Sequence, residues 1–177
     1  MKLLIYGARG WIGQQFCALL KDTEYISAQS RADNTQDVEN EIKKHSPTHI
    51  VSFIGRTHGH IGEKYYSTID YLEQTGKLKE NIRDNLFSPL VLGILCKKMD
   101  IHLTYLGTGC IFKYDQDHPF GKEEQGFLES SLPNFFGSGY STVKGFTDRL
   151  MPMLEGKILN LRIRMPIVGE DNPRNFI

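Results

Sequence analysis

The chain has 177 residues, of which 40% are hydrophobic and 24% are charged, an ordinary composition for one globular domain with a buried core. Lysine plus arginine and aspartate plus glutamate both number 21, and no long basic run occurs, so we expect neither nucleic acid nor membrane as a partner. Three widely spaced cysteines, no secretory signal and no apolar run of membrane-spanning length favour a cytoplasmic protein with reduced thiols.

The first residues predict a site for a dinucleotide. Leu3–Tyr6 has the apolar composition of a buried strand, and it leads into Gly7, Gly10 and Gly13, after which a helix follows. Glycines at these spacings allow a tight turn, close approach of a pyrophosphate and close packing of helix on strand, while the helix N-terminus adds partial positive charge. A plain strand-to-helix turn is the alternative, but the alternating strands and helices that follow favour the coenzyme site.

The end of the second predicted strand indicates which coenzyme binds. Tyr25–Gln29 is followed by Ser30 and Arg31, at the place where an acidic residue would bind the ribose hydroxyls of NAD. An arginine there suits a 2′-phosphate, and Arg9 in the glycine loop could reach the same group. We therefore expect NADP(H) rather than NAD, the alternative for each arginine being a solvated surface side chain.

Strands and helices continue to alternate along the chain. We predict a helix over Val38–His45, a buried strand over Thr48–Ile54, a long helix over Leu78–Met99, and strands over Ile101–Leu106 and Lys157–Arg164. Repeated units of this kind predict an α/β protein, a Rossmann-type doubly wound parallel sheet with helices on both faces. Gly55 follows the third strand, where a coenzyme passes close to the backbone.

Two segments have the composition of loops. Arg56–Gly62 is polar and rich in glycine, and its His58 and His60 lack a third ligand at a metal-binding spacing, so we expect a loop facing substrate or solvent and no metal. Lys113–Phe136 is a long irregular connection, a kind that is usually functional or disordered. In the long helix, Asn85 is expected at the surface, with a hydrogen bond to backbone beside the active site as the alternative.

The segment Gly137–Lys144 places Tyr140 and Lys144 four residues apart, which is one helical turn, so both can meet one ligand. The apolar stripe of this helix is predicted at Val143, Phe146, Leu150 and Leu154. The pair would then lie at the edge of the stripe and face a cleft. Because such a pair arises easily by chance, its value depends on whether the rest of the chain builds the dinucleotide site that it would serve. Alternation along an extended segment puts Thr108 and Cys110 on one side.

Together these residues resemble those of an extended short-chain dehydrogenase/reductase. The chain is similar to nucleotide-sugar reductases of the dTDP-4-dehydrorhamnose reductase type and, among them, to the bifunctional 3,5-epimerase/4-reductases that make nucleotide-linked L-rhamnose in plants and giant viruses. The resemblance covers essentially the whole chain and is carried by Gly7–Gly13, Thr108–Phe112, Pro133–Phe135, Gly137–Ser141, Leu161–Ile167 and Asn172–Ile177.

The resemblance implies an NADPH-dependent enzyme that reduces a nucleotide-linked 4-keto-6-deoxy sugar, combined with 3,5-epimerisation. In it Tyr140 supplies the proton, Lys144 assists that phenol, Thr108 binds the ketone oxygen, and Cys110 is the acid/base of epimerisation. A small buried hydrophobic residue is the alternative for Cys110. The absence of an Asp-Glu pair after Thr108 argues against 4,6-dehydration.

The coenzyme-binding positions that the resemblance implies are Gly7, Arg9, Gly10, Trp11, Ile12, Gly13, Arg31, Gly55, Tyr140, Lys144 and Pro166. The substrate-binding positions that it implies are Thr57, Asn134, Arg174, Asn175 and Phe176. Residues 1–177 correspond to the NADP-binding domain with the catalytic residues, and family members continue into a small C-terminal substrate domain that carries a lysine partner for the cysteine.

Alternatives stay open at this point. A pure 4-reductase and a catalytically silent NADP-binding regulatory subunit both fit the same residues. The choice between UDP and dTDP, the presence of an acetamido group on the sugar and the number of associated chains, a homodimer being one option, are not fixed by the sequence.

Overall fold

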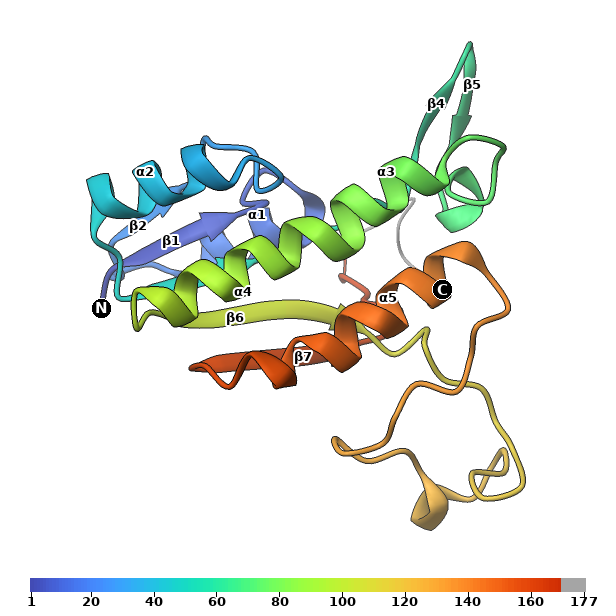
Figure 1. Cartoon of the computed structure of the whole chain (residues 1–177). Coiled ribbons are helices and arrows are strands. Elements are labelled where there is room, and N and C mark those ends of the chain that lie inside the picture. The colour runs from blue at the N-terminus through green and yellow to red at the C-terminus, as the bar shows by residue number, and fades with distance from the viewer. Residues whose placement is uncertain (170–177) are drawn as a thin grey trace.

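The structure, a computed structural model, describes residues 1–169 and has a five-stranded sheet in the order β2-β1-β3-β6-β7 (Figure 1). Its strands are β1 Leu3–Tyr6, β2 Tyr25–Ser27, β3 His49–Ser52, β6 His102–Thr108 and β7 Ile158–Ile163. All neighbouring strands pair in parallel. This order, which grows outward in both directions from β1 and β3, confirms the predicted Rossmann-type fold.

Helices cover the sheet from both sides (Figure 1). The helices are α1 Trp11–Leu19, α2 Thr35–His45, α3 Leu78–Ile82, α4 Ser88–Lys98 and α5 Gly139–Leu150, with single 3-10 turns at Ile69–Tyr71, Glu123–Gln125 and Pro152–Leu154. Side chains of β1 alternate between the faces: Leu3 and Ile5 pack against α1, whereas Leu4 and Tyr6 join the larger core beneath α2 and α4. Burial of β1 on both faces fixes the glycine loop that follows it.

A π-helical segment, Arg83–Phe87, joins α3 to α4 in one continuous helix that confirms the prediction for Leu78–Met99. Pro89 has no N–H, so it cannot bond the carbonyl of Asn85 four residues earlier. Ser88 instead bonds the carbonyl of Arg83, through both its N–H and its hydroxyl. The carbonyl of Asn85 accepts a bond of 2.6 Å from the hydroxyl of Thr147 on α5. The distortion thus ties two helices together.

The buried face of α5 differs from the predicted stripe. Val143 is buried, but Phe146 and Leu150 are 51% and 37% exposed, and the residues that face the protein are Tyr140, Ser141, Lys144, Thr147 and Asp148. Most of these are polar, and each polar side chain among them has a hydrogen-bond or electrostatic partner on a neighbouring element. Hydrophobic spacing therefore misplaced the inward face by roughly a third of a turn.

The predicted loop after β3 also needs correction. Residues Gly59–Ile61 and Lys64–Tyr66 form an antiparallel hairpin, β4 and β5, which projects from the molecule at the end of α3 (Figure 1). The intervening Gly62 has a positive φ of 57°, which suits the tight turn. The connection Lys113–Phe136 is irregular apart from its single 3-10 turn, as predicted.

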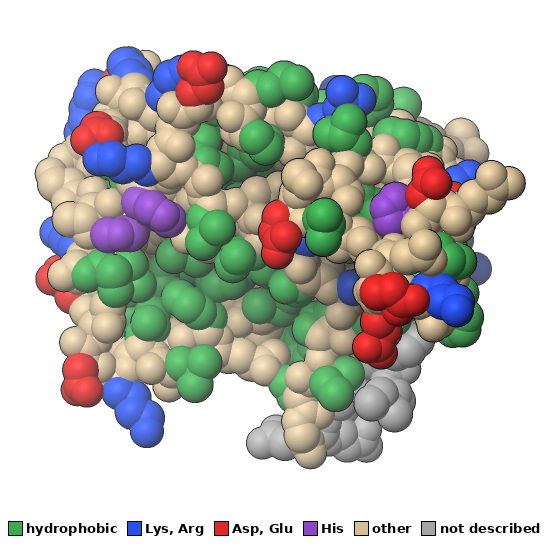
Figure 2. Space-filling view, turned by 90° about the horizontal axis from the view of Figure 1, so that it is seen from below, with side chains coloured by type: hydrophobic (Ala, Val, Ile, Leu, Met, Phe, Trp, Pro, Cys, Tyr) green, Lys and Arg blue, Asp and Glu red, His purple; other side chains and the backbone are tan. Residues whose placement is uncertain are grey.

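One part of the sheet carries exposed apolar side chains. Along β7, Ile158 packs on the core and Asn160 bonds α5, whereas Leu159 and Leu161 point to the other side and are exposed. Hydrophobic side chains gather on the underside of the molecule, the side on which β7 lies (Figure 2). Within residues 1–169 no helix is long and apolar enough to cross a membrane.

We expect Thr147→Val to destabilise the fold by about 1–3 kcal/mol, because it leaves the buried Asn85 carbonyl without its donor while preserving shape. Thr147→Ser keeps the hydroxyl and is the matched control, with a smaller loss from the missing methyl group. Urea unfolding followed by circular dichroism measures both. Equal losses in the two variants would show that packing, and not this hydrogen bond, holds the helices together.

Candidate active site

The glycine loop has the geometry that the sequence predicts. Gly7 adopts a positive φ of 79°, and a Cβ added at Gly13 would lie 2.2 Å from the carbonyl oxygen of Gly7. Only glycine fits either position, because the one needs a left-handed backbone and the other lets α1 approach the loop. Gly10 is the N-cap of α1 and offers no side chain to cap it. The first turn of α1 can therefore bind an anion.

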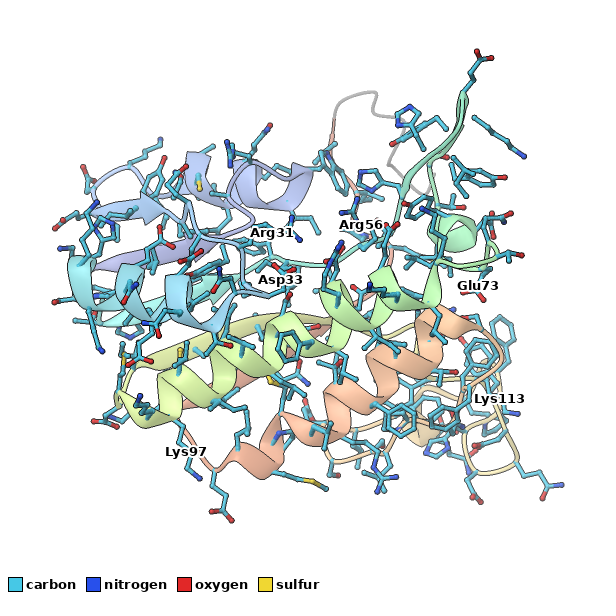
Figure 3. All side chains as sticks on the ribbon, turned by 45° about the horizontal axis from the view of Figure 1, so that its top comes forward. Arg31, Asp33, Arg56, Glu73, Lys97 and Lys113 are labelled. Carbon is cyan, nitrogen blue, oxygen red and sulfur yellow. The ribbon has the colours of Figure 1, made fainter. Side chains whose placement is uncertain are left out.

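A cavity of about 370 Å³ opens at this loop, at the carboxyl end of the sheet. Its lining includes Gly7, Arg9, Gly10, Arg31 and Gly55, all predicted to bind coenzyme, together with Tyr6, Ala8, Ser27, Ala28, Gln29, Ser30, Ala32, Asp33, Phe53, Ile54, Arg56, His58, Asp84 and Ser88. Figure 3 shows that Arg31, Asp33 and Arg56 lie near one another at this end of the molecule. The glycine loop and the predicted arginine thus share one cavity.

Glu41 of α2 organises the segment that carries Arg31. Its carboxylate accepts bonds from the N–H groups of Gln29 and Ser30, at 2.7 and 3.1 Å, and from the hydroxyls of Ser30 and Tyr6. Burial raises the pKa of this carboxyl, but the hydrogen bonds outweigh burial and hold the pKa below its usual range. A charged Glu41 therefore shapes the rim of the cavity.

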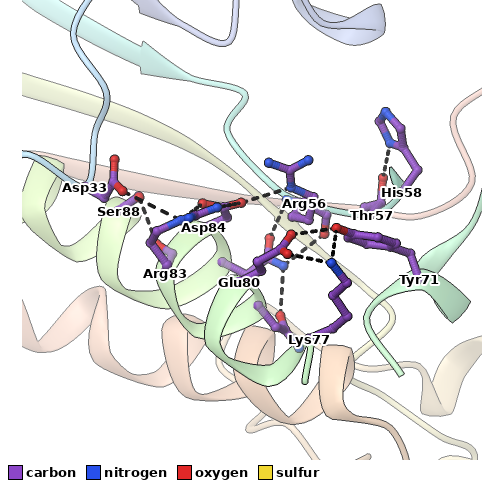
Figure 4. A network of polar contacts seen from close by, with 12 residues as sticks. Asp33, Arg56, Thr57, His58, Tyr71, Lys77, Glu80, Arg83, Asp84 and Ser88 are labelled. Carbon is purple, nitrogen blue, oxygen red and sulfur yellow. Dashed lines mark hydrogen bonds and ion pairs between the residues drawn. The ribbon is translucent and has the colours of Figure 1, made fainter. Parts of the chain in front are cut away.

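An ion-pair network crosses the same rim (Figure 4). Asp84 accepts bonds from Arg83 at 2.7 and 3.0 Å and from Arg56 at 3.0 Å, while Asp33 lies 3.0 Å from Arg31 and 3.6 Å from Arg83. Burial raises the pKa of Asp84, but the guanidinium groups of Arg83 and Arg56 lower it by more. The pKa of Asp84 therefore lies below its usual range. The three cations and two anions of this network have one net positive charge.

Asn85 lies inside the protein, which corrects the expectation of a surface position. Its side-chain oxygen accepts the N–H of Arg56 at 2.9 Å, and its side-chain nitrogen donates to the carbonyl of Arg56 at 2.9 Å. This pair of bonds fixes the backbone just after Gly55. The structure therefore confirms the alternative expectation for Asn85, a side-chain hydrogen bond to the backbone beside the site.

The predicted catalytic residues meet at the end of β6. Tyr140 forms a buried cluster with Tyr71 and Leu72, against which Cys110 packs, and the Thr108 hydroxyl interacts with its phenol and lowers the phenol's pKa. The hydroxyl of Thr108 also accepts the N–H of Cys110 at 3.1 Å. These three predicted side chains form one cluster. Neither Tyr140 nor Lys144 lines the cavity at the glycine loop.

The electrostatics of the pair favour a protonated phenol. Burial raises the pKa of Tyr140, and the charge of Lys144 and the hydrogen bond with Thr108 only partly offset it. Burial lowers the pKa of the Lys144 ammonium, against the opposing effects of Tyr140 and Asp148. A neutral phenol beside a cation is the state that a proton donor requires.

The first turn of α5 is bound by two side chains. Glu73, which precedes α3, accepts the N–H groups of Gly139 at 2.8 Å and Tyr140 at 3.0 Å. The hydroxyl of Ser138, the N-cap, accepts the N–H of Ser141 at 3.0 Å. The negative charge of Glu73 also suits the positive end of the helix dipole. The backbone of Tyr140 is therefore fixed directly.

Arg162 of β7 ties the long connection to α5. Its guanidinium binds both carboxylate oxygens of Asp148, at 2.9 and 2.7 Å, and donates to the carbonyls of Leu128, Glu129 and Ser131. A second cavity of about 460 Å³ opens beside this connection. It is lined by Gly109, Phe112, Lys113, Tyr114, Phe127, Phe135 and Arg164.

The remaining predicted binding residues are dispersed. Trp11 and Ile12 lie in the first turn of α1, outside the cavity lining, and Pro166 is exposed after β7. The hydroxyl of Thr57 forms a hydrogen bond of 3.1 Å with the ring Nδ1 of its neighbour His58. Asn134 binds the backbone of Lys113 and the carboxylate of Asp115, which holds the connection. Arg174, Asn175 and Phe176 lie outside the described residues.

Four residues that support the site were not predicted: Glu41, Glu73, Arg162, and Tyr105 of β6, whose hydroxyl accepts a hydrogen bond from Lys144. Each contacts a partner that is distant in the sequence; Glu73 and Gly139, for example, are 66 positions apart. Two of them had a weak signal, since a glutamate at an inward helix position and an arginine inside a strand both require partners. In residues 1–169 no cluster of three or more metal-ligating side chains occurs.

No protein-family model matches the chain. Over its full length it is 56% identical to the protein L780 of Acanthamoeba polyphaga mimivirus, of which it covers 60%. The crystal structure of that protein, described as a UDP-rhamnose synthase, superposes with a TM-score of 0.90 over 99% of the chain. The chain therefore spans about 60% of the length of this relative.

A plant protein is also similar. The chain is 36% identical, over 98% of its length, to a bifunctional dTDP-4-dehydrorhamnose 3,5-epimerase/reductase of Arabidopsis thaliana, of which it covers 55%. A dTDP-4-dehydrorhamnose reductase from Bacillus anthracis, in complex with NADP, superposes with a TM-score of 0.71 over 91% of the chain and 52% of that structure. Its 17% identity shows the fold alone.

We expect Glu41→Gln to destabilise the protein by about 1–3 kcal/mol near neutral pH, because two N–H groups and two hydroxyls lose a charged acceptor. The folded pKa of Glu41 lies below that of the unfolded chain, so its contribution is present above about pH 4.3. The contribution is lost as the pH falls through the folded pKa, and the two proteins then become equally stable. Urea unfolding over a pH series measures this, with Glu63→Gln at the exposed hairpin as the control. A difference that persists at low pH would contradict the charged network.

Proposed function

Because the chain belongs to the family of nucleotide-rhamnose epimerase/reductases, we propose that it forms the coenzyme-binding and catalytic part of an NADPH-dependent reductase of nucleotide-linked 4-keto-6-deoxy sugars. The observation that carries this proposal is the cluster at the end of β6, in which Thr108 and Cys110 lie next to Tyr140 and Lys144 lies one turn further along α5. We further propose that the same cluster performs 3,5-epimerisation.

The cavity at the glycine loop fits the adenosine diphosphate half of NADP(H). A side chain at Gly13 would collide with Gly7, so α1 can approach the loop and present its uncapped first turn to the diphosphate. Arg31 and Arg9 line the cavity and would hold the 2′-phosphate. The coenzyme, when bound, supplies the hydride to the ketone carbon.

The chain's own residues supply the proton and orient the ketone. Thr108 would donate a hydrogen bond to the ketone oxygen, and Tyr140 would transfer its proton to that oxygen as the alkoxide forms. Lys144 stabilises the resulting phenolate through its positive charge. Burial of the cluster strengthens each of these interactions because water does not screen them.

Epimerisation uses the same oxygen. Removal of the proton from C3 or C5 places negative charge on the ketone oxygen, where Thr108 and Tyr140 stabilise it as an enolate. Cys110 is half-buried and packs against the cluster that contains Tyr140, which places its thiol near the proposed position of the ketone. We assign Cys110 as a proton donor or acceptor in this step.

The second cavity suits the nucleotide part of the substrate. Its aromatic rings, from Phe112, Phe127 and Phe135, offer surfaces for a base, and Lys113 and Arg164 offer cations for a diphosphate. Gly109 belongs to this lining and separates Thr108 from Cys110, so a sugar attached to a nucleotide bound here would extend toward the catalytic cluster.

The decisive test is to incubate the full-length protein with NADPH and UDP-4-keto-6-deoxyglucose and to identify the stereochemistry of the product. We expect a UDP-linked L-rhamnose. Tyr140→Phe should lower kcat by about 10²–10⁴-fold, because the proton donor is lost. Tight binding of NADPH without any ketone reduction would instead indicate a regulatory subunit.

Cys110→Ala separates the two activities. We expect this variant to lose turnover of UDP-4-keto-6-deoxyglucose but to keep turnover of the already epimerised ketone, UDP-4-keto-L-rhamnose. Product analysis by nuclear magnetic resonance measures both. Unchanged turnover of the first ketone would assign the cysteine to packing alone.

Arg31→Met tests the choice of coenzyme. We expect it to weaken NADPH binding by about 10–100-fold, the loss of one charge-assisted contact, and to leave NADH binding nearly unchanged. Arg149→Met, at an exposed arginine of α5 that does not line the cavity, is the matched control. Titration calorimetry of the chain with each coenzyme measures the effect. Equal weakening of NADPH and NADH binding would show that Arg31 does not bind the 2′-phosphate.

A further inference from the structure

Tyr105 lies on β6 and points toward α5, the helix that carries Tyr140 and Lys144. Its side chain is 1% exposed, and its hydroxyl oxygen accepts a hydrogen bond of 2.5 Å from the Nζ atom of Lys144. The same Nζ atom lies 4.7 Å from the centre of the Tyr105 ring. Lys144 is itself 4% exposed, so solvent has little access to this contact.

A buried ammonium needs acceptors to keep its charge. Within residues 1–169, the hydroxyl of Tyr105 is the one hydrogen-bond acceptor of the Lys144 ammonium. Burial alone lowers the pKa of this group. The hydroxyl of Tyr105 therefore opposes deprotonation of the lysine inside the protein.

Other charged and titratable groups face this pair from several elements. On α5, Asp148 lies one turn beyond Lys144, but its carboxylate is shared with Arg162 and Asn160 of β7. After β6, the thiol of Cys110 faces the pair. From the segment before α3, Tyr71 packs against Tyr140, and the carboxylate of Glu73 binds the backbone of α5.

Tyr105 remains a neutral acceptor in this setting. Burial raises its pKa, and the nearby charge of Asp148 raises it further. The phenol of Tyr105 is therefore neutral near neutral pH, and its dipole can bind the ammonium without cancelling the charge.

We propose that Tyr105 is a positioning residue of this active site, whose hydroxyl keeps the Lys144 ammonium charged and held beside Tyr140. This inference rests on the proposed function for its catalytic meaning, but the contact itself requires neither coenzyme nor substrate. Its consequence is that the buried site retains the charge of Lys144, which lowers the pKa of the Tyr140 phenol against the effect of burial.

Tyr105→Phe tests the proposal in the chain without ligands. With ring-¹³C tyrosine and ¹⁵N lysine, nuclear magnetic resonance follows the titration of Tyr140 and of Lys144, assigned with Tyr140→Phe and Lys144→Met. We expect the pKa of Lys144 to fall and that of Tyr140 to rise, each by about 1 pH unit, the effect of losing one hydrogen bond to a charged group. Tyr6→Phe, which removes another buried tyrosine hydroxyl, is the matched control and leaves both titrations unchanged.

A double-mutant cycle shows whether the effect passes through the lysine. In the Lys144→Met background, adding Tyr105→Phe should not change the pKa of Tyr140 any further. An equal rise in both backgrounds, or an unchanged or lowered Tyr140 pKa in Tyr105→Phe, would overturn the proposal. Should Tyr105→Phe not fold, the wild-type chain decides, because absence of a nuclear Overhauser contact between the Lys144 ammonium and the Tyr105 ring overturns it as well.

The same variant, assayed in the full-length protein, separates this inference from the proposed function. The basic limb of the kcat profile for ketone reduction should move upward with the Tyr140 titration, whereas a purely structural role would lower kcat at every pH alike. A shifted titration in a protein that reduces no ketone would retain the Tyr105 contact and reject the reductase assignment.

Discussion

Helix α5 rests on the protein through buried polar side chains, and each is bonded to a different element. Thr147 bonds the π segment, Asp148 bonds β7, Lys144 bonds β6, and Ser141 bonds the turn that follows β6. An apolar interface can slide or rotate at small cost, but these bonds are satisfied in one arrangement only. They fix the rotation of α5, and with it the direction of Tyr140.

The two halves of the site are held by different kinds of interaction. Around the glycine loop, exposed or half-exposed ion pairs such as Arg31 with Asp33 form the rim, and salt and ligands compete with such contacts. Around the Tyr140 phenol, Thr108, Tyr105 and Lys144 are buried, and within residues 1–169 the exposed carboxylate of Glu73 binds only the backbone at the start of α5. The first half can adjust to an arriving anion, whereas the second is prepared in advance for proton transfer.

Local features of the site could be predicted from sequence. The glycine spacing at Gly7–Gly13 and the placement of Tyr140 and Lys144 on one helix depend on backbone geometry within a few residues, which sequence reports directly. The cavity at the loop contains Arg31, as the end of the second strand indicated. These positions are found because neighbours along the chain determine them.

Features that depend on distant partners could not be predicted. Glu73 matters because it meets the start of α5, and nothing near it in the sequence indicates this. The inward face of α5 was misplaced because Phe146 and Leu150 suggested an apolar stripe, whereas the helix buries side chains such as Thr147 that find their acceptors elsewhere. Hydrophobic spacing identifies a core face only when that face is apolar.

The π segment at Arg83–Phe87 sets a requirement on chain length. A π turn accommodates one residue more than regular α-helical winding, so removal of a single residue there would rotate α3 against α4 by about 100°. Asn85 would then turn away from Arg56, and the backbone beyond Gly55 would lose both of its bonds. Related chains that keep this arrangement must tolerate substitutions in the helix more readily than insertions or deletions.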